Sequence, residues 1–199
     1  MKFVVRHVPR KERKKCIEQL KSQIPELVVV EDTGGRPMET FADALRHGEN
    51  EPIVMLEDDI ELTNRFCEKI ECAVSERPHE IINFFNVGNK SNRKKYRAGK
   101  HFNWMQCVYL PRGYGGMIAE FCENTWVSFY NELNNGAHPH SIRCNANTLF
   151  DAAIAEWLAG RDEKYFIWHP ALVQHLAIES AIEPGRVPIE WRSSSFVKD

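Results

Sequence analysis

Short apolar runs alternate with longer amphipathic segments along the first half of the chain. Runs of strand length lie at residues 3–5, 27–30 and 53–56. Between them, residues 10–24 carry apolar side chains at helical spacing, and a second amphipathic segment ends near Gly48. Strands that alternate with helices are typical of a parallel sheet joined by right-handed crossovers. The pattern therefore predicts an α/β fold with a mostly parallel central sheet flanked by helices.

The second half continues this pattern with longer interruptions. We expect helices at residues 63–76, 118–134 and 149–158, and strands at residues 81–85, 105–110, 166–168 and 172–173. Residues 89–101 are polar without apolar periodicity and predict a mobile loop, whereas residues 111–116 predict a glycine-rich turn. Neither an internal repeat nor a linker divides the sequence, so residues 1–199 are expected to form one domain.

Charge, cysteine content and the length of the apolar runs indicate where the protein works and what it binds. The formal net charge is −2 and the pI is near 6.5, so only a local patch would attract nucleic acid or a membrane surface. The six cysteines include no C-x-x-C pair and are typical of reduced thiols in a cytosolic protein. The sequence has no apolar run of the roughly 18–20 residues that span a membrane, and no signal-peptide pattern. We therefore expect a cytoplasmic protein without a transmembrane segment.

Polar residues follow each of the first three predicted strands. They are Arg6-His7, Glu31-Asp32 and Glu57-Asp58-Asp59. Ligands of parallel sheets bind beyond the carboxyl ends of the strands, so these residues mark a candidate site. Three consecutive acids repel one another, and burial increases the repulsion. A divalent cation with a phosphate ligand would supply the counter-charge; the alternative is an acidic strand end that caps the following helix.

The segment Met55-Leu56-Glu57-Asp58-Asp59 resembles the DxD-type motif of GT-A glycosyltransferases. It has the Glu-Asp-Asp form seen in the lipopolysaccharide glycosyltransferase (family 25) group, and the short chain is also similar to small phage-type glycosyltransferases. The resemblance implies a single GT-A domain, with a nucleotide-sugar half at about residues 1–100 and an acceptor and closing half at about 101–199. It also implies that Asp59 binds Mn²⁺ or Mg²⁺, that Glu57 is its partner acid, and that Asp58 contacts the ribose or sugar.

A second resemblance lies in the C-terminal half. Residues 166–175, ending in Pro170-Ala171-Leu172-Val173-Gln174-His175 and followed by Glu179-Ser180, resemble a Pro-x-Leu-Val-x-His…Ser segment near the end of many GT-A enzymes. The resemblance implies that His175 is the second metal ligand; the alternative is a hydrogen-bonded histidine at the end of a strand. Ala177 departs from the glycine that relatives often carry two residues after this histidine.

Asp151 stands at the start of the predicted helix 149–158. In inverting GT-A enzymes an acid at this place deprotonates the acceptor hydroxyl, so the resemblance implies that Asp151 is the general base. The alternative is an acid that interacts favourably with the helix dipole. Arg6 and Asp32, at the first two strand ends, are expected from topology to contact the nucleotide.

Together these features predict a metal-dependent glycosyltransferase that moves a sugar from a nucleotide diphosphate sugar, with a UDP-sugar as first candidate, to a hydroxyl acceptor. The basic residues Arg93, Lys94 and Lys95 allow two functional interpretations, a loop over the diphosphate or a contact with DNA, beside the alternative of a solvated surface loop, which is the commonest fate of such runs. A hydroxymethylated base in phage DNA is therefore one acceptor, in which case the enzyme works in the host cytoplasm. The alternatives are a bacterial surface-polysaccharide or lipopolysaccharide glycosyltransferase and a nucleotidyltransferase.

Overall fold

The computed structural model describes residues 1–87, 96–99, 102–126, 128, 149–180, 185 and 192–198. Its strands are β1 (Lys2–His7), β2 (Val28–Glu31), β3 (Ile53–Glu57), β4 (Ile60–Leu62), β5 (Ile81–Asn83), β6 (Tyr96–Ala98), β7 (Cys107–Leu110), β8 (Tyr165–Trp168) and β9 (Val173–His175). Its helices are α1 (Lys11–Gln23), α2 (Pro37–Arg46), α3 (Phe66–Glu76), α4 (Tyr114–Phe121), the π-helix η1 (Cys122–Trp126) and α6 (Phe150–Gly160).

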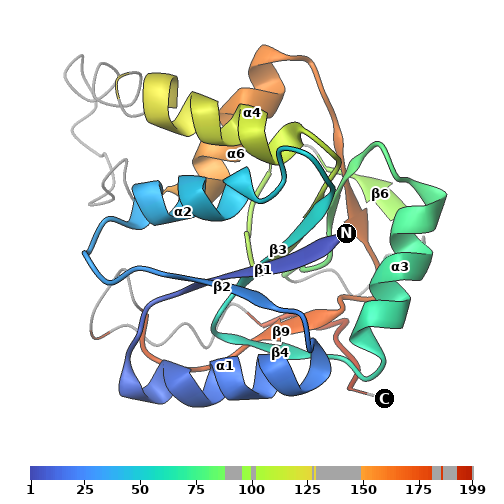
Figure 1. Cartoon of the computed structure of the whole chain (residues 1–199). Coiled ribbons are helices and arrows are strands. Elements are labelled where there is room, and N and C mark those ends of the chain that lie inside the picture. The colour runs from blue at the N-terminus through green and yellow to red at the C-terminus, as the bar shows by residue number, and fades with distance from the viewer. Residues whose placement is uncertain are drawn as a thin grey trace.

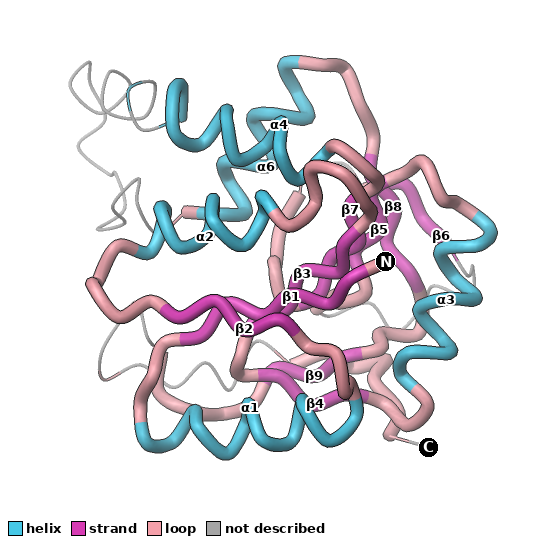
Figure 2. Tube along the Cα trace, viewed as in Figure 1, coloured by secondary structure: helices cyan, strands magenta, loops and turns pink. Residues whose placement is uncertain are grey.

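Seven strands form the central sheet in the order β2-β1-β3-β7-β5-β8-β6. The pairs β1–β2, β1–β3 and β5–β8 are parallel, whereas β7 and β6 run antiparallel to the strands beside them. Most strands therefore share one direction, which confirms the predicted α/β fold with a mostly parallel central sheet flanked by helices (Figure 2).

Helices cover both faces of this sheet (Figure 1). Helices α2, α4 and α6 pack on one face, whereas α1 and α3 lie on the other. The alternation of side chains along β1 shows how the sequence supplies both layers, because Val4 belongs to the core beneath α2 and its neighbour Val5 to the core above α1. Both faces of β1 and β3 are largely buried, which explains why these two apolar runs lack a polar alternation.

A separate two-stranded sheet lies on the α1 side of the molecule (Figure 1). Strand β4 begins directly after the acidic triplet and pairs antiparallel with β9. Its first residue, Ile60, is opposite His175, the last residue of β9. This small sheet joins segments that are more than a hundred residues apart in the sequence and brings the predicted closing segment to the end of β3.

The predicted elements agree with the structure except at three places. Strand β4 was not expected, and β6 lies within residues 89–101, which the polar composition assigned to a loop. Part of the predicted turn at 111–116 is helical, since α4 begins at Tyr114. The reason is packing: an added Cβ at Gly115 would lie 2.2 Å from the carbonyl oxygen of Leu45, so its glycine permits α4 to approach α2 closely.

No described helix combines the length and the apolar character that a membrane crossing needs. The predicted basic residues Arg93, Lys94 and Lys95 lie outside the described residues, as does most of the predicted helix after Trp126.

Candidate active site at the carboxyl end of the sheet

The carboxyl ends of β1, β2 and β3 lie next to one another because the three strands are parallel neighbours. Arg6 is paired in register with Glu57, and His7 with Glu31. The backbone N–H of Asp32 continues the ladder by donating to the carbonyl oxygen of His7 (2.8 Å). The structure thus brings the three polar strand ends together, as the topology predicts.

Glu57 faces the guanidinium of Arg6. Arg6 Nη2 donates to Glu57 Oε2 (2.7 Å), and the Arg6 guanidinium carbon lies 4.0 Å from the ring centroid of Phe150 at the start of α6. Burial raises the pKa of the Glu57 carboxyl to about 7, with Asp59 and Asp58 adding to the rise and Arg6 opposing it. Through Arg6, the end of β3 is connected to the first turn of the helix that carries Asp151.

Asp58 is buried and engaged through both carboxylate oxygens. Its Oδ1 accepts a hydrogen bond from Arg13 Nη1, and its Oδ2 accepts from His7 Nδ1 (2.7 Å) and from the backbone N–H of Val8 (3.1 Å). Only 1% of the residue is exposed. The carboxylate therefore fixes the end of β1 and the start of α1, and a contact between Asp58 and a ribose or sugar would require one of these donors to give way.

Asp59 lies between α1 and the closing segment. Its Oδ2 accepts from Arg13 Nη2 (2.9 Å) and lies 3.6 Å from His175 Nε2. The carbonyl oxygen of Asp59 also accepts from the backbone N–H of Leu176 (2.8 Å), which extends the β4–β9 pairing by one bond. The two residues predicted as metal ligands are therefore brought together by backbone pairing.

The ring of His175 is oriented with Nε2 toward Asp59. His175 Nδ1 donates a hydrogen bond to the carbonyl oxygen of Leu176 (2.8 Å). In the neutral imidazole this bond places the lone pair on Nε2, and the hydrogen bond of one ring nitrogen commonly sets which nitrogen binds a metal. His175 is also 4% exposed, so its position is fixed by packing.

A carboxylate and a neutral imidazole are a suitable donor pair for Mn²⁺. Two protein ligands leave coordination positions for water and substrate phosphate, which such cations usually retain. Within the part of the chain that the structure describes, no group of three or more His, Cys, Asp or Glu side chains surrounds a common cation position. Asp59 and His175 are thus the two protein ligands that the described residues would offer to a cation, and Asp59 Oδ2 would have to exchange its bond from Arg13 Nη2 (2.9 Å) for the cation.

Arg13 is the functional residue that the sequence reasoning missed. It is 4% exposed, bridges Asp58 and Asp59, and donates through Nη2 to the carbonyl oxygen of Glu179 (3.0 Å). The sequence did contain a signal, because Arg13 lies three, four and seven residues before Cys16, Ile17 and Leu20 and so shares their inward helix face. A charge on a buried face requires a charged partner. The acidic triplet thus has counter-charges of its own in Arg6 and Arg13.

Two further predicted site residues have local contacts. Asp32 Oδ1 accepts from the backbone N–H of Arg36 (3.0 Å) at the turn before α2, and Asp151 Oδ1 accepts from the N–H of Ala152 (2.9 Å) in the first turn of α6. Each contact leaves a second carboxylate oxygen for a ligand. The nucleotide role of Asp32 and the base role of Asp151 stay predictions.

The two buried arginines also retain donor capacity. Arg6 Nε and Arg13 Nε are buried N–H groups without a hydrogen-bond partner among the described residues. A buried donor that stays unpaired costs about 1–3 kcal/mol, so such groups are uncommon away from functional sites. Both lie beside the acidic triplet, whose carboxylates accept from the other guanidinium nitrogens of the same two arginines.

Comparison with protein families finds no family model that matches the chain, and comparison with curated proteins finds no match. Among solved structures the chain is similar to A197 from STIV, with 13% identity, a TM-score of 0.42, and coverage of 88% of this chain and 86% of that chain. It is also similar to a glycosyltransferase involved in the glycosylation of the major capsid of PBCV-1 (11% identity, TM-score 0.39, coverage 85% and 95%). A third is S. aureus TarS 1-349 (12% identity, TM-score 0.48, coverage 89% and 61%). At these identities and TM-scores the likenesses assign no function to the chain.

Proposed function

We propose that this chain is a glycosyltransferase that moves a sugar from a nucleotide diphosphate sugar to a hydroxyl acceptor. The observation that carries the proposal is the approach of His175 Nε2 to within 3.6 Å of Asp59 Oδ2. These two residues are distant in the sequence, and the motif resemblance alone predicts both as metal ligands. Their meeting at the carboxyl edge of a parallel sheet is what a donor site of this kind requires.

In this proposal Asp59 and His175 would hold Mn²⁺ or Mg²⁺, which would supply positive charge to stabilise the leaving diphosphate. Arg6 orients Glu57 at the end of β3 and would contact the nucleotide of the donor. Asp151 accepts the proton of the acceptor hydroxyl as it attacks the anomeric carbon, which gives an inverting displacement.

The proposed acceptor is a hydroxyl on a polyanion such as phage DNA that carries a hydroxymethylated base. Its support is the basic sequence Arg93-Lys94-Lys95. Binding to duplex DNA should weaken steeply as salt is raised and should weaken further when the three residues are neutralised, because phosphate contacts release counterions. If no such binding is measured, the proposal reverts to a polysaccharide acceptor.

A thermal-stability screen tests the donor site. UDP-sugars and GDP-sugars are added with and without Mn²⁺, because a ligand that binds only the native state raises its Tm. We expect one class to stabilise the protein only with the cation, and Asp59→Asn and His175→Ala to abolish the shift. Asp43→Asn, an exposed carboxylate on α2, is the matched control and should retain it. A cation-dependent shift that persists in both site variants would overturn the assignment.

A further inference from the structure

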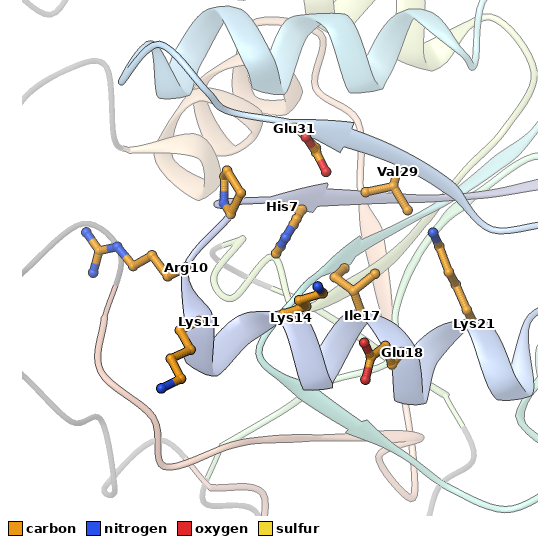
Figure 3. A pocket seen from close by; sticks show the side chains of 10 residues that line it. His7, Arg10, Lys11, Lys14, Ile17, Glu18, Lys21, Val29 and Glu31 are labelled. Atoms are coloured by element: carbon orange, nitrogen blue, oxygen red, sulfur yellow. The ribbon is translucent and has the colours of Figure 1, made fainter.

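A groove of about 590 Å³ lies between α1 and the neighbouring strands β1 and β2 (Figure 3). Its volume is within the range of roughly 300–1,000 Å³ typical of small-molecule sites. Strand β2 is the edge strand of the described sheet, and the lining residues of α1 extend from Lys11 to Lys21, about 15 Å along the helix axis. Neither Asp59 nor His175 lines this groove.

The middle of the groove is apolar. Ile17 points from α1 toward the strands, and Val29 points from β2 toward the helix (Figure 3). His7 lies at the inner wall, where its Nδ1 contacts Asp58 at 2.7 Å. One wall residue is thus shared between the groove and the acidic triplet.

The groove is also lined by cationic residues. Arg10, Lys11, Lys14 and Lys21 line the groove, and the three lysines are exposed. Across the described residues, no ion pair engages any of the three lysines, although carboxylates are close by in sequence. Their positive charge is therefore available to a ligand.

Two carboxylates, Glu18 and Glu31, also line the groove, so that cations outnumber acids. A bare oligophosphate would meet these acids unfavourably. A ligand that combines a phosphate with hydroxyl groups suits both, because carboxylates accept hydrogen bonds from hydroxyls and ammonium groups donate to phosphate.

We propose that this groove binds a hydroxyl-bearing phosphate ester and that it does so without a divalent cation. The phosphate accepts from Lys14 and Lys21, the ring of the ligand covers Ile17 and Val29, and its hydroxyls face Glu31. This site goes beyond the proposed function, since it needs neither Asp59 nor His175. The phosphate ester belongs either to a nucleotide or to a phosphorylated sugar.

Isothermal titration calorimetry in EDTA tests this site. The ligands are a hexose phosphate, a nucleoside diphosphate and inorganic pyrophosphate. We expect one of the two hydroxyl-bearing esters to bind more tightly than pyrophosphate, and the tighter ester identifies the source of the phosphate. The double variant Lys14→Gln/Lys21→Gln should weaken that binding by roughly a hundredfold, because each of the two charge-assisted hydrogen bonds that it removes is worth about tenfold.

Lys15→Gln is the matched control, because Lys15 is an exposed lysine of the same helix that does not line the groove. The affinity of Lys15→Gln for the ester should equal that of the wild-type protein. Asp59→Asn should also bind the ester normally, which separates this site from the donor site. Absence of binding in EDTA, pyrophosphate binding as tight as the tighter ester, or equal losses in Lys15→Gln and the double variant would overturn the proposal.

Discussion

Replacement of Arg13 tests whether the acidic triplet depends on the counter-charge that the structure provides. Arg13→Met keeps a long apolar stem and removes the guanidinium that bridges Asp58 and Asp59. The two carboxylates would then remain next to each other, and the side chain of Asp58 is only 2% exposed. Burial and mutual repulsion would both raise the free energy of the folded state.

The expected loss follows from the burial of all three side chains. Arg13, Asp58 and Asp59 have side-chain exposures of 4%, 2% and 12%. Removing one partner of such a buried pair costs about 3–5 kcal/mol of unfolding free energy. At about 2–4 °C for each kcal/mol in a chain of this size, Tm should fall by roughly 6–20 °C.

The assay is urea denaturation followed by circular dichroism, with two companion variants. Arg36→Met is the matched control, because Arg36 pairs with Glu39 at exposures of 69% and 62% and should lose no more than about 1 kcal/mol. The double variant Arg13→Met/Asp58→Asn removes one of the stranded charges and should recover part of the loss. A loss in Arg13→Met no larger than that in Arg36→Met would refute the buried counter-charge.

Two further predictions concern packing and thiol reactivity. Gly115→Ala should destabilise the fold by about 1–3 kcal/mol, because its Cβ would lie 2.2 Å from the carbonyl oxygen of Leu45, whereas Gly160→Ala, with open space around it, should be neutral or stabilising in the same denaturation assay. An equal effect of the two would contradict the close approach of α4 to α2. Burial raises the pKa of the Cys122 thiol to about 12, so at pH 8 iodoacetamide should label exposed Cys72 first and Cys122 only after unfolding, as read by mass spectrometry. Early labelling of Cys122 in the native protein would contradict its burial.

The layered fold was predictable because its signals are local. Val4-Val5 and residues 53–56 form apolar runs of strand length, and α1 and α2 show helical spacing, so each element is specified by its own residues. Strand β4 was not predictable in the same way. Three residues directly after an acidic triplet carry little periodicity, and the strand exists because β9 supplies its hydrogen-bond partners from the far end of the chain.

In the candidate site, too, the residues marked by a local motif were predictable, whereas the residue that depends on tertiary packing was not. Asp59 and His175 were chosen by motif, and the structure brings them together through the register of β4 with β9. Arg13 was missed because it stands among the basic residues of an apparently solvated helix N-terminus. Arg13 differs from exposed Lys14 only in its position on the apolar face of α1. Its partners, Asp58 and Asp59, come from the end of β3 and are brought to it by tertiary packing.

Hydrolysis of nucleotide-sugars tests whether Asp59 and His175 form a cation-dependent donor site. Purified protein is incubated with UDP- or GDP-sugars and Mn²⁺, and release of the nucleoside diphosphate is measured beside Asp59→Ala and an EDTA control. We expect the wild-type protein to release the nucleoside diphosphate, and EDTA and Asp59→Ala each to abolish this release. Release that survives Asp59→Ala, or no release from any of the donors, would contradict this expectation.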